Sequence, residues 1–195
     1  MQMSGQTWLG AAASFLTMWV VMMVAMMLPS LVPTLWRYRQ AGLGLMTLLV
    51  GVGYFVVWTV FGLAAFLLAA PLARAVPIAV GVVVLLAGSV QLTAWKAHHL
   101  ACCRAAPAPG RTLSADAGTA WRHGLRLGLH CSQCCVGLMA ILLVIGVMDL
   151  RAMAVIAAAI TVERLAPSGE RVARATGAVA LGVGSLLIAR AAGLG

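Results

Sequence analysis

The sequence predicts an all-α membrane protein, a bundle of about six transmembrane helices, with five as the other possible number. Two observations carry this prediction. Hydrophobic residues make up 63% of the 195-residue chain and charged residues only 9%, whereas soluble domains carry roughly a quarter charged residues. Apolar runs that approach the roughly 20 residues needed to cross a bilayer also recur along the whole length. We therefore expect residues 1–195 to form a single transmembrane helical domain surrounded by lipid.

Proline and basic residues divide the apolar runs into the expected helices. In order, these are Trp8–Leu28, Gly42–Ala70, Ala75–Trp95, Leu127–Met148, Ala152–Ala166 and Ala175–Ala192. Pro29 and Pro33 mark the end of the first run. The fifth run is the doubtful span, because its 15 residues rise only about 22 Å against a hydrocarbon core of about 30 Å. A polar cytoplasmic loop is expected at about 96–126, where Pro107-Ala108-Pro109-Gly110 is a clear loop signal.

The formal net charge of +9 indicates a membrane topology and no nucleic-acid partner. The basic residues stand singly between apolar runs and form no tract that could follow a phosphate backbone. With six spans, ten of them share the odd-numbered connections: Arg37, Arg39, Lys96, Arg104, Arg111, Arg122, Arg126, Arg164, Arg171 and Arg174. The opposite side holds only Arg74, Arg151 and Arg190. The positive-inside rule then places the odd connections in the cytoplasm and both termini outside.

Three groups of soft metal-ligand residues are expected at the same membrane face. At helical spacing, cysteines at i, i+3 and i+4 share one face of the fourth helix, next to a histidine. Two His/Cys pairs at i, i+4 end the third helix, and a methionine stripe lies near the end of the first. The candidate metal ligands are Cys131, Cys134, Cys135, His130, His98, His99, Cys102, Cys103, Met22, Met23, Met26 and Met27.

Thiolate and thioether ligands select Cu(I), Zn(II) or iron–sulfur centres, so we expect a transition metal ion, with Cu(I) favoured and Zn(II) possible. Packing of methionine and cysteine in an apolar core is the competing interpretation. Cys131-x-x-Cys134 also suggests a membrane thiol–disulfide oxidoreductase with a quinone partner, although thiols facing the cytosol stay reduced. A scaffold subunit is a third possibility. Without a catalytic motif, a non-enzymatic role is favoured. Glu163 is either a functional carboxylate at membrane depth or an interfacial residue.

Three segments together resemble one known family. They are Met22–Ser30, Gln91–Lys96 with Cys102-Cys103-Arg104, and Gly128-x-x-Cys131-x-x-Cys134-Cys135 with Leu138-Met139. The family is a bacterial domain-of-unknown-function family of predicted metal-binding integral membrane proteins, and the resemblance runs from Trp19 to about Gly184. It implies a multi-pass protein of the bacterial inner (cytoplasmic) membrane with a metal site. We expect metal handling, transport or delivery, with a metallochaperone or a metalloenzyme being matured as partner.

Overall fold

The computed structural model describes residues 8–72, 77–104, 116–146 and 149–193. Over these ranges the chain forms seven α-helices and no strand, which confirms the all-α prediction. The helices are α1 Trp8–Gln40, α2 Gly44–Leu72, α3 Pro77–Gln91, α4 Ala94–Arg104, α5 Ala117–Ile145, α6 Leu150–Leu165 and α7 Gly169–Ala191.

Four of these helices, α1, α2, α5 and α7, are long and apolar enough to cross a membrane. A fifth span is obtained if α3 and α4 count together as one span with a 64° bend. The fifth apolar run forms α6, whose 16 residues fall short of a full crossing. The described helices therefore supply four or five spanning elements, and the expected six are not reached among them.

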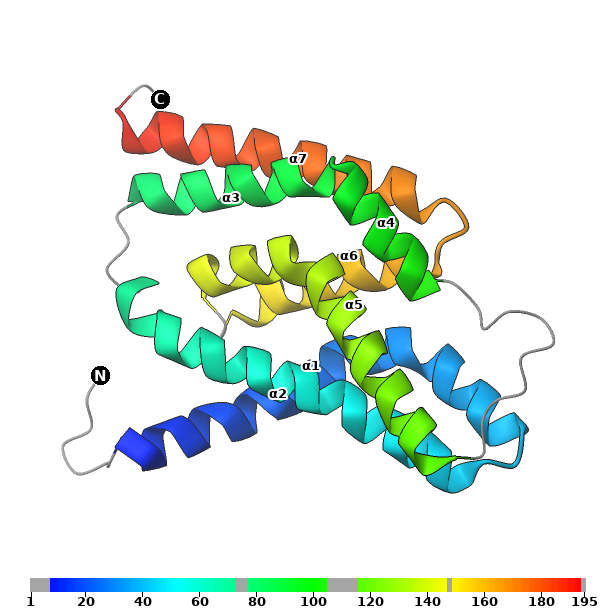
Figure 1. Ribbon diagram of the computed structural model, residues 1–195. Coiled ribbons are helices and arrows are strands. Elements are labelled where there is room, and N and C mark those ends of the chain that lie inside the picture. Colours follow the sequence, from blue (N-terminus) through cyan, green and yellow to red (C-terminus); the bar gives the residue numbers. More distant parts are fainter. Residues whose placement is uncertain (1–7, 73–76, 105–115, 147–148, 194–195) are drawn as a thin grey trace.

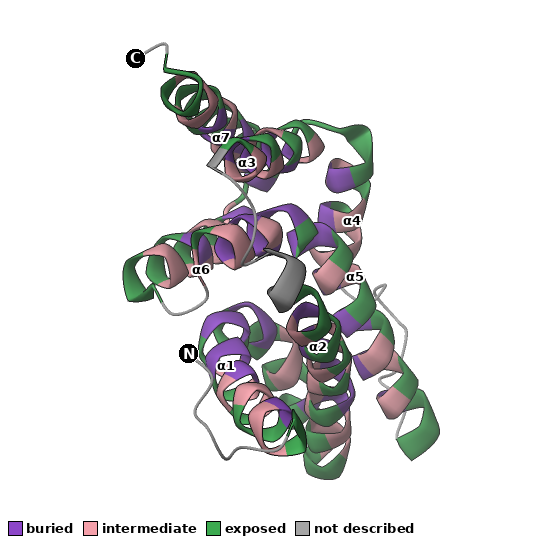
Figure 2. Cartoon of the chain, turned by 90° about the vertical axis from the view of Figure 1, so that its left-hand side faces the viewer, coloured by how far each residue is buried: buried purple, intermediate pink, exposed green. Residues whose placement is uncertain are grey.

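The helices are arranged in three layers (Figures 1 and 2). The antiparallel pair α1 and α2 forms one outer layer, and the antiparallel pair α3 and α7 forms the other. Helices α5 and α6 lie between them, and α4 leads from the end of α3 to the side of α5. This arrangement brings α1, α4, α5 and α6 together in the middle of the molecule.

Pro29 and Pro33 do not end the first helix, because α1 continues through both of them to Gln40. Proline inside a helix removes a backbone donor, but neighbouring helices and Ser side chains can satisfy the freed groups in a membrane bundle. Next to Pro29, the Ser30 hydroxyl donates to the carbonyl oxygen of Met27 at 2.8 Å. The methionine stripe consequently lies near the middle of α1 instead of at its end.

The expected polar loop at 96–126 is largely helical. Residues 94–104 form α4 and residues 117–126 begin α5, while Pro107–Gly110 and Arg111 lie outside the described residues, as does Arg74. Asp116 caps α5 by accepting from the backbone N–H of Thr119 at 2.7 Å, and these local hydrogen bonds lower the pKa of its carboxyl group. The fourth helix thus starts ten residues earlier than Leu127, so Cys131 lies near the middle of a 29-residue helix.

Two glycines allow α5 to pack closely against α2. A Cβ atom at Gly128 would lie 2.9 Å from the carbonyl oxygen of Tyr54, and one at Gly124 would clash with the backbone of Val50. Small residues permit such backbone approach between membrane helices. The close packing places the Tyr54 side chain beside the cysteines one turn further along α5.

Candidate metal centre

Helices α1, α4 and α5 direct sulfur-containing side chains into one core cluster. On these three helices its sulfur members are Met22, Met23, Met26 and Met27 from α1, Cys103 from α4, and Cys131, Cys134, Cys135 and Met139 from α5. All are buried except Cys103, which is half-buried and packs against the others. We call these residues the sulfur cluster. It contains eight of the twelve ligands predicted from the sequence.

The thiols in this cluster are close to one another. The Sγ atoms of Cys131 and Cys135 are 3.9 Å apart, and Cys103 and Cys134 belong to the same packed cluster. The five cysteines of the chain are all free. The thiol that shares a hydrogen bond with Cys131 is that of Cys135, one helical turn away. The oxidoreductase alternative had instead paired Cys131 with Cys134 as the exchanging thiols.

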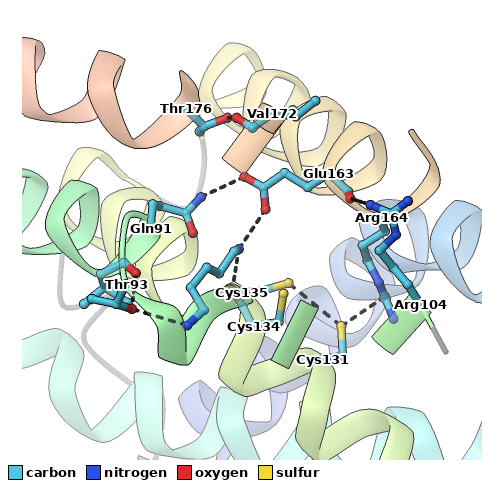
Figure 3. A network of polar contacts seen from close by, with 12 residues as sticks. Gln91, Thr93, Arg104, Cys131, Cys134, Cys135, Glu163, Arg164, Val172 and Thr176 are labelled. Atoms are coloured by element: carbon cyan, nitrogen blue, oxygen red, sulfur yellow. Dashed lines mark hydrogen bonds and ion pairs between the residues drawn. The ribbon is translucent and has the colours of Figure 1, made fainter. Parts of the chain in front are cut away.

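Cys131 receives hydrogen bonds from two donors on other helices. The Tyr54 hydroxyl donates to its Sγ at 2.9 Å. Nη1 of Arg164 donates to the same sulfur at 3.2 Å (Figure 3). The same Arg164 nitrogen donates to the Ser30 hydroxyl at 2.7 Å. A guanidinium and a phenol O–H aimed at one sulfur form the environment that a thiolate, free or metal-bound, requires.

A fully buried ion pair lies beside the cluster. Nζ of Lys96 is 2.7 Å from Oε2 of Glu163, and both side chains are 1% exposed. Lys96 also donates to the backbone carbonyl of Cys134 at 2.7 Å, and Gln91 donates to the other carboxylate oxygen of Glu163 at 2.7 Å. These bonds join α3, α4, α5 and α6 (Figure 3). Because each member has a partner, the pair can persist in an apolar interior.

The topology prediction counted three basic residues as charges in cytoplasmic loops, but they bind to groups inside the bundle. They are Lys96, Arg104 and Arg164. Lys96 and Arg164 are buried, and Arg104 donates to the carbonyl oxygens of Glu163, Ala166 and Pro167 at the end of α6. Glu163 is buried and pairs with Lys96 of α4. The sequence contained a signal for this ion pair. The chain has only four acidic residues, so a carboxylate at the end of an apolar run was a candidate partner for a buried basic residue.

The predicted histidines form a second, separate group between α4 and α5. The ring centres of His98 and His99 are 5.5 Å apart, and those of His99 and His130 are 5.8 Å apart. Cys102 belongs here, with its Sγ 3.7 Å from Nε2 of His98. The structure thus divides the predicted ligand set into the sulfur cluster and this group, which we call the imidazole group: His98, His99, Cys102 and His130.

The donor chemistry of the sulfur cluster fits Cu(I). A metal–thiolate bond is about 2.3 Å long, so two sulfurs 3.9 Å apart can both reach one ion. Methionine thioethers belong to the same core cluster. Hard cations do not fit, since Glu163 is the one carboxylate buried among the described residues and it is engaged by Lys96. Within those residues, no three His, Cys, Asp or Glu side chains are already placed around a common metal position, so methionine or a rotated thiol would have to complete a site.

Comparison with known families decides the class of the protein. The model of the PpoB2 family, described as copper chaperone, matches residues 16–187. The chain belongs to this family. No curated protein and no solved structure matches the sequence. Membership of a copper chaperone family supports copper handling in general, and it agrees with the metal-binding family expected from the sequence motifs.

The buried Lys96–Glu163 ion pair offers a direct test of the packing around the site. Glu163→Gln leaves the Lys96 ammonium without a counter-charge, so we expect the free energy of unfolding to fall by about 3–5 kcal/mol. Thermal unfolding of the detergent-solubilised protein measures this. Glu170→Gln is the matched control, because Glu170 forms an exposed pair with Arg174 at 2.5 Å and such pairs contribute little. Equal melting temperatures for the two variants would contradict the structural role of the buried pair.

Proposed function

We propose that the protein is an integral membrane copper-binding protein that holds Cu(I) in the sulfur cluster and delivers it to a metalloenzyme being matured or to another copper carrier. The family match supports copper handling. One observation supports the choice of this site. The buried Cys131 thiol accepts a hydrogen bond from the buried Arg164 guanidinium, and Arg164 has no carboxylate partner within the described residues.

Charge balance in the core favours bound Cu(I). Lys96 and Glu163 neutralise each other, which leaves the positive charge of Arg164, only 7% exposed, to be compensated. An uncompensated buried charge costs several kcal/mol. A thiolate at Cys131 supplies the compensation. A Cu(I) ion between two thiolates carries one net negative charge, so the guanidinium would balance the loaded site as well.

The surface of the bundle supports insertion in a membrane. Large apolar side chains are exposed on the outward faces of its long helices, among them Leu48 and Val60 on α2 and Val179 on α7. Contiguous exposed apolar surface marks a protein or membrane interaction site. We place the protein in the bacterial inner membrane. If α5 crosses as one helix, the thiols near its middle lie at membrane depth and not at the cytoplasmic face.

The thiols are tested by anaerobic titration with Cu(I) in competition with a chromophoric Cu(I) chelator. We expect the wild-type protein to bind one Cu(I) tightly in the sulfur cluster, and Cys131→Ser or Cys135→Ser to abolish this tight binding, because a hydroxyl is a poor ligand for a soft ion. Cys102→Ser is the control, since Cys102 lies outside the cluster. Retention of tight Cu(I) binding by both cluster variants would refute the proposed site.

The methionines of α1 are tested by the double substitution Met23→Leu with Met27→Leu. Leucine conserves volume, so stability should change by less than about 1.5 kcal/mol, while the loss of two thioethers should weaken Cu(I) binding measurably in the same competition assay. Met46→Leu is the control, because Met46 packs in a separate cluster with Tyr38. Unchanged affinity in the double variant would show that these methionines only pack.

A further inference from the structure

We propose that His99 and His130 form a separate exchange site through which Cu(I) passes between the exterior and the sulfur cluster. This inference rests on the proposed function, because it assigns a route to and from that cluster. The pair lies between α4 and α5, with the exposed His98 on its outer side. The site is distinct from the sulfur cluster in both ligand type and position.

The two imidazoles are neighbours, and each has one buried ring nitrogen that no described residue satisfies. Nδ1 of His99 and Nδ1 of His130 are both buried and have no hydrogen-bond partner in the part of the chain that the structure describes, and the ring centres are 5.8 Å apart. An unsatisfied buried polar atom costs about 1–3 kcal/mol, so a purely structural histidine would be expected to use this nitrogen. Two such nitrogens at one helix interface point to a shared ligand.

A single metal ion is the ligand whose size fits between these rings. Imidazole nitrogens bind metal ions at about 2.0 Å, and imidazole is a suitable ligand for copper. Rings whose centres are 5.8 Å apart can therefore share one ion after small rotations. Trp95 packs against His99, with ring centres 4.6 Å apart, and restrains that ring. The third ligand is available from His98 or Cys102, which lie next to each other at the surface.

The imidazole pair also borders the sulfur cluster. His99 and Cys103 are four residues apart on α4, and His130 and Cys134 are four residues apart on α5. Each histidine therefore lies one helical turn from a thiol of the sulfur cluster. The order of ligands from outside to inside is therefore His98 with Cys102, His99 with His130, Cys134 with Cys103, and Cys131 with Cys135. From the His99 and His130 pair inward, the ligands change from borderline imidazole nitrogen to soft thiol sulfur, which favours inward movement of Cu(I).

Transfer by this route is a ligand exchange without change of oxidation state. A bond from Cu(I) to an imidazole nitrogen breaks, a bond from Cu(I) to the Cys134 sulfur forms, and the thiol proton of Cys134 moves to the imidazole nitrogen that has been released. Delivery to a partner is the reverse exchange. Neither direction requires an oxidant or a reductant.

The exchange role is tested with the double variant His99→Gln with His130→Gln. We expect the sulfur cluster to keep its Cu(I) affinity, while stopped-flow transfer of Cu(I) between the protein and a chromophoric chelator slows by at least about tenfold. His123→Gln is the control, because His123 lies on α5 but is hydrogen-bonded to Tyr38 at 2.6 Å, away from the pair. Unchanged transfer rates would overturn the proposal. A loss of affinity equal to the loss of rate would place the imidazoles in the sulfur site itself and also overturn it.

A second experiment makes the inference testable even if the sulfur cluster binds no copper. The triple variant Cys131→Ser, Cys134→Ser, Cys135→Ser, checked for retained helix content, is given one equivalent of Cu(I) without oxygen. X-ray absorption should then show nitrogen ligands, and these should disappear when His99→Gln and His130→Gln are added. No bound ion, or a spectrum that the histidine changes do not alter, would exclude the exchange site.

Discussion

The buried charges of Lys96, Glu163 and Arg164 constrain the centre of this structure. In apolar surroundings each charge must meet a partner or cost several kcal/mol, so the short helices have to bring the partners together. The 64° bend between α3 and α4 brings Lys96 to Glu163, and the end of α6 places Arg164 against Ser30 and Cys131. The short helices α4 and α6 therefore serve to complete this polar core, which explains why they are too short to cross a membrane.

That polar core gives the thiols a role that packing alone would not. Cys131 lies between a phenol and a guanidinium, and the backbone of Cys134 accepts from Lys96. A cluster of apolar thiols would need no cations around it. Together with membership of a copper chaperone family, the surplus positive charge of Arg164 supports the proposed binding of a soft metal ion by thiolates.

The sequence predicted the helical class and most helices, because long apolar runs determine them almost regardless of tertiary contacts. Helical spacing in the sequence also identified the cysteines, histidines and methionines as candidate ligands. It did not reveal that α1 continues past Pro29, because proline in a sequence usually marks the end of a helix. Nor could Lys96 and Arg164 be told from loop charges, because their partners are 67 and 33 residues away in sequence. The division of histidines from thiols likewise arises only from the packing of α4 on α5.

The central claim is that sulfur ligands beside Arg164 hold copper as Cu(I). The most direct measurement is copper X-ray absorption on the wild-type protein loaded anaerobically with one equivalent of Cu(I). The account predicts a first shell dominated by sulfur at about 2.3 Å. A first shell made of nitrogen and oxygen alone would contradict it, since the ion would then lie outside the sulfur cluster.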